Sequence, residues 1–124
     1  MKTFSFLAAF ILFSALAVAQ SSVQSGAFSV TPTVTGFTLD KGTGERSVSI
    51  EITFDKPFDK KPKIVLSTVS IDTDNKSNVR YKIEANSVSR DGFMVKVTTW
   101  ADSKIYSLGG NWLAHSETEA ATAK

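Results

Sequence analysis

The chain has 124 residues, with 14 basic and 12 acidic side chains and no cysteine, which suits one domain of nearly balanced charge. That balance provides no electric field to attract nucleic acid or an anionic membrane, so we expect neither as a partner. Without cysteine, no disulfide stabilises the domain or links its copies, and its core must form by packing alone.

The first nineteen residues differ from the rest of the chain. Phe4 to Ala19 is almost wholly apolar, and the small residues Ala17 and Ala19 flank Val18 just before polar Gln20. This pattern predicts a signal peptide over residues 1–19 and hence a secreted, extracellular protein. The alternative is an N-terminal membrane anchor, for which the apolar run is short.

The remaining sequence predicts one β-rich domain over residues 28–114, preceded by a linker segment over 20–27 and followed by a disordered polar tail over 115–124. Ser47 to Phe54 alternates apolar and polar residues, which predicts a half-buried strand. Lys63 to Ile71 is rich in apolar residues, namely Ile64, Val65, Leu66, Val69 and Ile71, which predicts a more deeply buried strand.

Glycines separate these runs. Lys41 to Gly44, Asp91-Gly92 and Gly109-Gly110 are expected to supply the positive φ angles of tight turns. Several short strands with turns between them predict an all-β fold, a single-domain antiparallel β-sandwich.

Trp100 breaks the alternation of its own strand, because it shares a face with polar Lys96 and Thr98 rather than with the apolar residues. A turn at Asp91-Gly92 with a one-residue bulge near Asn86 would reconcile this strand with its neighbour. Lys82 would then lie opposite Trp100, and Arg80 opposite Asp102.

Catalysis and metal binding have little support. The single histidine, His115, lies at the edge of the predicted tail, and no spacing selects a pair of carboxylates, so we expect no enzyme. Asp72 to Asn75 resembles the start of a calcium loop, but the glycine and the final glutamate of such loops are missing, so we expect no metal and no cofactor. Asn75-Lys76-Ser77 is a glycosylation sequon, which makes Asn75 a candidate for modification.

The best candidate site combines Arg80, Trp100, Asp102 and Tyr106. A sugar presents an apolar C–H face and a ring of hydroxyls, and it is bound by an aromatic surface together with fixed charged groups. The alternative is a structural pair of Arg80 and Asp102, with Trp100 packed at a sheet edge.

Several segments, in order, resemble the H-type lectin domain of the snail agglutinins and the discoidins. These segments are Val23 to Gly26, Ile52 to Phe54 with the following Pro57-Phe58, Lys61 to Ser67, Asn78 to Tyr81, Asp91 to Phe93, Thr99 to Ser107 and Trp112 to Ala114. The resemblance covers about residues 23–114. Each segment alone is a weak signal, and their common order is fairly specific.

The resemblance implies six strands, a homotrimer, and glycans as partners, with galactose-configured N-acetylated sugars such as N-acetylgalactosamine preferred. It implies that Arg80 bonds the sugar hydroxyls and that Trp100 and Tyr106 lie beside the ligand. It also implies an acidic residue from the loop before the Ser47 to Phe54 strand, either Asp40 or Glu45, with Asp40 favoured.

Two departures from the family bear on the expected function. Ala101 stands where the snail proteins carry a histidine that helps to read the acetamido group, which predicts weaker selectivity for N-acetylated sugars. The cysteines that join snail trimers are absent, which favours a simple trimer. A structural or protein-binding β-sandwich that has lost sugar binding is the alternative function.

Overall fold

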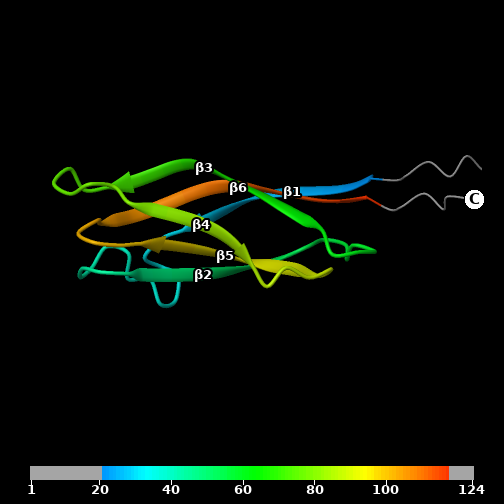
Figure 1. The fold of residues 1–124 in the computed structure, drawn as a ribbon, viewed down its shortest axis with the longest axis horizontal. Coiled ribbons are helices and arrows are strands. Elements are labelled where there is room, and N and C mark those ends of the chain that lie inside the picture. The colour runs from blue at the N-terminus through cyan, green and yellow to red at the C-terminus, as the bar shows by residue number, and fades with distance from the viewer. Residues whose placement is uncertain (1–20, 118–124) are drawn as a thin grey trace, which may run out of the picture.

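The computed structural model describes residues 21–117, which form two three-stranded antiparallel sheets packed face to face (Figure 1). One sheet has the order β1-β6-β3 and the other β2-β5-β4. The strands are β1 (Ser21–Val30), β2 (Arg46–Thr53), β3 (Lys63–Thr73), β4 (Tyr81–Asn86), β5 (Gly92–Thr99) and β6 (Ile105–Glu117). The predicted all-β, six-stranded antiparallel sandwich is therefore confirmed, whereas the predicted signal peptide lies outside the described residues.

Apolar and polar residues alternate along β2 and β5, which explains why one face of their sheet packs on the core. Val95 pairs with Ile50 and Val97 pairs with Val48, and these four apolar side chains point to the other sheet. Between them, Ser49 pairs with Lys96 on the outer face. One face of this sheet is therefore apolar and the other polar, as the period of two requires.

Aromatic side chains fill the end of the core that is farther from the candidate site. The ring of Phe54 lies 4.8 Å from that of Phe58, 5.7 Å from that of Phe93 and 5.7 Å from the indole of Trp112, measured between centroids. Gly26 lies over that indole so closely that a Cβ atom would come within 2.7 Å of Nε1. The glycine thus lets β1 pass directly above the buried tryptophan.

Both predicted ends of the domain are wrong. Residues 21–27, predicted as part of a linker, belong to β1, and residues 115–117, predicted as the start of the tail, belong to β6. The two strands pair over their whole length, from Ser21 with Glu117 to Val30 with Leu108. Backbone hydrogen bonding to a long partner holds β1 in place even though its sequence lacks a regular apolar alternation.

Two further expectations need correction. β3 is not deeply buried: Val65 and Val69 are exposed, because this strand lies at the edge of its sheet and only one of its faces meets the core. Gly109 and Gly110 form no turn but lie within β6, and a Cβ on Gly110 would come within 2.2 Å of the Ser67 carbonyl oxygen. Likewise Gly92 begins β5, where a Cβ would meet the Ile52 carbonyl oxygen.

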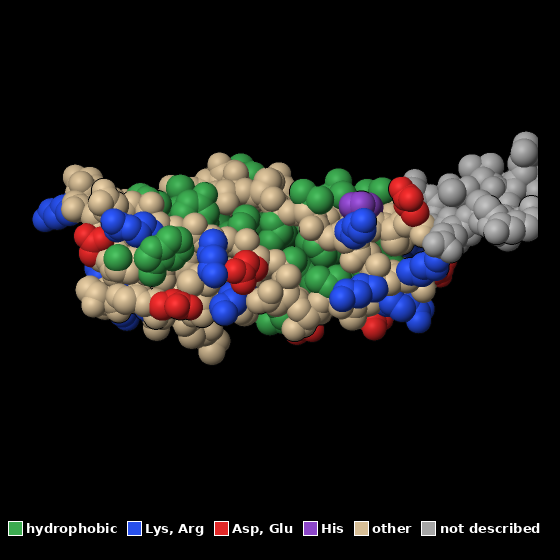
Figure 2. All heavy atoms as spheres, in the orientation of Figure 1, with side chains coloured by type: hydrophobic (Ala, Val, Ile, Leu, Met, Phe, Trp, Pro, Cys, Tyr) green, Lys and Arg blue, Asp and Glu red, His purple; other side chains and the backbone are tan. Residues whose placement is uncertain are grey.

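Charges of both signs are mixed over the face of the molecule seen in Figure 2, with apolar side chains between them. Within residues 21–117 no helix is long and apolar enough to cross a membrane. Gly42 and Gly44 have positive φ angles of 69° and 81°, as their predicted turn requires.

Candidate functional site

The candidate residues gather at one end of the sandwich, where three connections meet. The segment between β1 and β2, the loop between β3 and β4 and the turn between β5 and β6 all lie at the left of Figure 1. Backbone hydrogen bonds join them: Gly44 N donates to Ala101 O at 2.9 Å, and Asp74 N donates to Lys104 O at 3.3 Å. Side chains from distant parts of the sequence are thereby brought together on a connected backbone.

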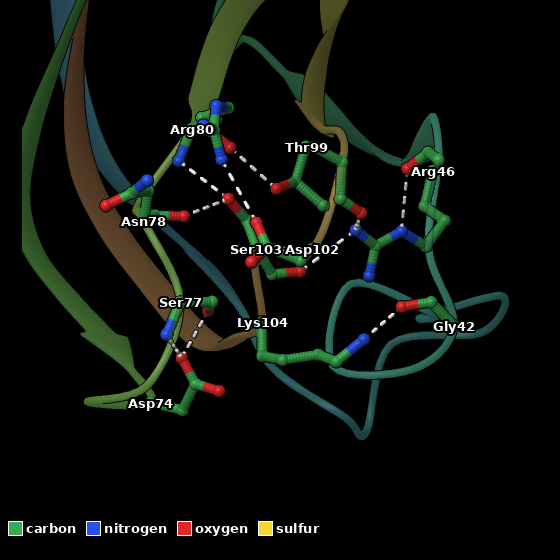
Figure 3. Close-up of polar contacts among 12 residues, drawn as sticks. Gly42, Arg46, Asp74, Ser77, Asn78, Arg80, Thr99, Asp102, Ser103 and Lys104 are labelled. Carbon is green, nitrogen blue, oxygen red and sulfur yellow. Dashed lines mark hydrogen bonds and ion pairs between the residues drawn. The ribbon is translucent and has the colours of Figure 1, made fainter.

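Arg80 and Asp102 form an ion pair at this end. Arg80 Nη1 lies 3.0 Å from Asp102 Oδ1, and the two side chains are 36% and 62% exposed (Figure 3). Arg80 precedes β4, whereas Asp102 lies in the turn after β5. The carboxylate therefore fixes the direction of a guanidinium that still has free donors facing solvent.

The predicted proximity of Arg80 and Asp102 is confirmed, but the strand register behind it is wrong. Lys82 pairs with Thr98 rather than with Trp100, a shift of two residues. The cause is the connection: β4 ends at Asn86 and β5 begins at Gly92, so a five-residue loop replaces the predicted two-residue turn and bulge. A shift of two keeps each side chain on its predicted face.

The same register brings Arg80 beside Trp100. Tyr81 pairs with Thr99, so the residues just beyond this pair are adjacent on the outer face of the sheet. The Trp100 side chain is 40% exposed. An indole surface and an anchored guanidinium are therefore both open to solvent, next to each other.

Two buried hydroxyls fix the backbone of Arg80. Ser103 Oγ accepts a hydrogen bond from Arg80 N at 2.9 Å and donates to Asn78 O, while Thr99 Oγ1 donates to Arg80 O at 2.6 Å. Thr99 and Ser103 are fully or almost fully buried. Sequence patterns place both residues within a longer motif but miss their role, because small polar residues at strand ends give no distinctive signal.

Arg46, the first residue of β2, is the other functional residue that sequence patterns miss. Its guanidinium donates to five carbonyl groups at 2.8–3.4 Å, those of Leu39, Lys41, Gly44, Ala101 and Ser103. One side chain thus ties the β1–β2 segment to the turn that carries Trp100 and Asp102. Its position just after a glycine-rich loop is the only sequence signal that could have revealed it.

The turn after β5 contains a residue in an uncommon conformation. Ala101 has a φ of 56°, in the left-handed region that non-glycine residues rarely adopt. Ser103 N closes the turn on Trp100 O at 3.4 Å, and Arg46 holds the Ala101 carbonyl. The surrounding hydrogen bonds therefore maintain a strained backbone between the two exposed candidate side chains.

Tyr106 and Asp40 are placed apart from this group. Tyr106 lies near the start of β6, in the other sheet, and its side chain is exposed. Asp40 is half-buried, and its Oδ1 has no hydrogen-bond partner within residues 21–117. Neither residue bonds to Arg80 or Asp102 within the described chain, whereas Glu45 lines a small cavity together with Trp100.

The β3–β4 loop carries the sequon. Asn75 is exposed, and the hydroxyl of Ser77 donates to Asp74 Oδ1 at 2.5 Å. This hydrogen bond, opposed in part by desolvation, lowers the pKa of the Asp74 carboxyl below its ordinary value. Ser77 thus closes the turn in which Asn75 is presented.

His115 pairs with Lys63 and Val23 at the opposite end of the molecule, away from the candidate residues.

The side chains gathered at this end can contact a ligand in three ways. Arg80 offers charged donors, Asp102 offers a carboxylate acceptor, and Trp100 offers an apolar face. Hydroxyl groups of a ligand would bond to the first two, and a C–H surface would pack on the third. In residues 21–117 no cluster of three or more histidine, cysteine or acidic side chains could hold a metal ion.

The sequence profile of the H-type lectin domain matches residues 49–115, more than half of the chain. The chain therefore belongs to the H-type lectin domain family, and it is a carbohydrate-binding type of domain. The match includes Arg80, Trp100, Asp102 and Tyr106, but it begins after Arg46.

Proteins with similar sequences occur in Fuscovulum blasticum and Dictyostelium discoideum. The chain is 33% identical over 73 residues to the ATP synthase subunits region ORF 7 protein of Fuscovulum blasticum, covering 59% of this chain and 64% of that protein. It is 31% identical over 77 residues to a discoidin-1 chain of Dictyostelium discoideum, covering 61% of this chain and 30% of that protein. The similarity thus spans only part of each relative.

A solved structure supports the fold. Discoidin II of Dictyostelium discoideum superposes with a TM-score of 0.70 at 24% sequence identity, over 81% of this chain and 38% of that chain. The shared sandwich is therefore evident in three dimensions although the sequences have diverged.

Proposed function

We propose that this protein is a secreted lectin that binds galactose-configured N-acetylated sugars, such as N-acetylgalactosamine, and that it does so as a multivalent homotrimer. Family membership supports carbohydrate binding in general. The observation that carries the specific proposal is the placement of Arg80, held at 3.0 Å by Asp102, next to the exposed indole of Trp100.

The proposed sugar contacts follow from the chemistry of these side chains. The guanidinium would donate to two ring hydroxyls, which is the bidentate geometry that arginine favours. The indole would pack against the apolar C–H face of the ring. Tyr106, and an acidic side chain of the β1–β2 segment, Asp40 or Glu45, would complete the site at the boundary with a neighbouring copy.

Multivalency is proposed because a single shallow sugar site binds weakly. A millimolar dissociation constant corresponds to about −4 kcal/mol, and presenting several sites on one particle can raise avidity by roughly 10²–10⁴. Closed cyclic symmetry gives a particle of limited size. The absence of cysteine requires that packing alone holds such a particle together.

The outer face of the β1-β6-β3 sheet is the surface that we propose for self-association. Val65 pairs with Leu113, which also pairs with Ser25, and Val23 lies one row further along the same face. The exposed fractions of Val23, Val65 and Leu113 are 56%, 55% and 39%, and a hollow of about 470 Å³ lies beside the last two. Adjacent exposed apolar side chains of this kind are typical of an interface.

A glycan array followed by calorimetry tests the sugar proposal. The protein should bind glycans that end in N-acetylgalactosamine, and Arg80→Ala should reduce that binding, whereas Lys60→Ala, at the far end of the molecule, should not. If the array shows no binding to any glycan, the protein is instead a structural or protein-binding sandwich.

Light scattering at micromolar concentration tests the assembly. We expect a trimer for the native chain and a monomer for Leu113→Asp, because a buried charge opposes association. Ser49→Asp is the matched control, since Ser49 is exposed on the outer face of the other sheet, outside the proposed face. A native chain that is strictly monomeric would rule out the trimer.

A further inference from the structure

A small cavity opens on the outer face of the β2-β5-β4 sheet, two residues along the strands from the row of Arg80 and Trp100. Its volume is about 220 Å³, and it is lined by Glu45, Lys82, Thr98 and Trp100. Sites for drug-sized ligands typically measure roughly 300–1,000 Å³, so this cavity suits a single ring. Because Lys82 pairs with Thr98, the cavity lies directly next to the row formed by Arg80 and Trp100.

The walls of this cavity, which we call the Lys82 cavity, offer three kinds of contact. Trp100 provides an exposed aromatic surface, and Glu45 and Lys82 provide an acceptor and a donor. Thr98, only 2% exposed, lies at its base, and its Oγ1 has no hydrogen-bond partner within residues 21–117. A buried hydroxyl without a partner is uncommon in folded proteins, and a polar ligand nearby is one way to explain it.

The charges around the cavity limit which ligands it can accept. Lys82 Nζ lies 3.0 Å from Glu84 Oε1. Its pKa is raised mainly by the hydrogen bond and charge of Glu84 and to a smaller degree by Glu45. Two carboxylates thus surround one ammonium group, which opposes an acidic ligand but leaves donors and acceptors for uncharged hydroxyls.

All four lining residues come from one chain, and they lie on the sheet opposite to the proposed self-association face. Trp100 belongs both to the candidate site and to the cavity wall, so a ligand held at Arg80 has a direct path to the cavity.

We propose that the Lys82 cavity binds an uncharged second pyranose ring of a glycan whose first ring is held at Arg80 and Trp100. This inference rests on the proposed lectin function and extends it, because the protein would then recognise disaccharides rather than single sugars. The second ring would pack against the indole, and its hydroxyls would bond to Glu45 and Lys82.

Calorimetry with matched sugars and variants tests this inference. The sugars are the methyl glycoside of N-acetylgalactosamine, a set of neutral disaccharides that join it to galactose in different linkages, and a disaccharide that joins it to sialic acid. The native protein should bind at least one neutral disaccharide about tenfold more tightly than the monosaccharide, as one added charged hydrogen bond would give. The sialylated compound should show no gain.

Lys82→Ala should lose the gain for the neutral disaccharide while it keeps the affinity for the monosaccharide. Lys96→Ala is the control, because Lys96 lies on the same outer face opposite Glu84 but does not line the cavity. It should keep both affinities. Lys82 is largely exposed and Lys96 lies on the outer face of the sheet, so neither substitution should impair folding.

The outcomes separate this inference from the proposed function. If the native protein binds the monosaccharide but gains nothing from any neutral disaccharide, or if Lys82→Ala keeps the gain, the cavity is not a sugar site although the lectin function stands. A gain confined to the sialylated compound would overturn the uncharged class of ligand. If no sugar binds at all, the proposed function fails, and this inference fails with it.

Discussion

The Asp102 carboxylate accepts a hydrogen bond from the Arg80 guanidinium at 3.0 Å across the end of a sheet. The Asp102 side chain is 62% exposed and that of Arg80 36%, so water and salt weaken their attraction, and such pairs contribute about 0–1 kcal/mol to stability. The main effect of the pair is therefore on the direction of the guanidinium. Substitution of either residue should therefore reduce sugar affinity but change the free energy of unfolding little.

Arg80→Ala should weaken sugar binding by about tenfold to a hundredfold, because a charged hydrogen bond contributes roughly 1.5–3 kcal/mol. Its free energy of unfolding should change by less than about 1 kcal/mol, since the hydrogen bonds to Ser103 and Thr99 use the backbone of residue 80. Calorimetry and urea unfolding measure the two effects. Unaltered sugar affinity in this variant would show that Arg80 is not in the site.

Trp100→Phe should abolish the change in tryptophan fluorescence that sugar binding causes in the native protein. The chain has two tryptophans, and the other one, Trp112, is buried in the core among phenylalanine rings. Any sugar-dependent emission should therefore come from Trp100. A titration of the variant with sugar is the measurement, and a spectral change that persists would point to Trp112 or to a wider rearrangement.

Arg46→Ala should lower both stability and sugar affinity, since five carbonyl groups on two segments lose their shared donor. We expect a loss of about 2–3 kcal/mol in the free energy of unfolding. Arg46→Lys should recover little of it, because an ammonium group cannot reproduce the planar fork of a guanidinium. Thermal unfolding and calorimetry of both variants provide the test. If Arg46→Lys kept the native stability and sugar affinity, the positive charge alone, and not the planar guanidinium, would be required at this position.

Gly110→Ala should destabilise the domain by about 2–3 kcal/mol or prevent folding, because overpacking against a fixed backbone cannot relax. The added Cβ would lie 2.2 Å from the Ser67 carbonyl oxygen and 2.5 Å from the Phe28 ring. Gly109→Ala is the neighbouring control, since its Cβ would meet the Ser70 hydroxyl, which can rotate away. Urea unfolding should show the larger loss at residue 110, and equal losses would contradict the proposed clash.

The sequence predicts the fold class well wherever one face of a strand is buried. Val48, Ile50 and Ile52 alternate with polar residues, and this period is sufficient to identify β2 and its buried face. β1 has no such period, so its residues resemble a linker in sequence. Its position depends on a ladder with β6, which forms only when residues 78 to 96 positions apart in the sequence meet.

The candidate site is predictable in part for a similar reason. The outward positions of Arg80 and Trp100 follow from strand parity, which a register shift of two leaves unchanged. The length of the β4–β5 loop and the five contacts of Arg46 depend on how distant loops pack, and local sequence patterns carry no information about that packing.

β1 begins and β6 ends as a hydrogen-bonded pair, with Ser21 opposite Glu117, at the end of the sandwich away from Arg80 and Trp100 (Figure 1). A linker, a tag or a solid support attached at either strand end would therefore hold the molecule by this end. The opposite end, with Arg80 and Trp100, would stay unobstructed. The geometry makes this domain suitable for oriented immobilisation, in which every tethered copy presents the same tip to its surroundings.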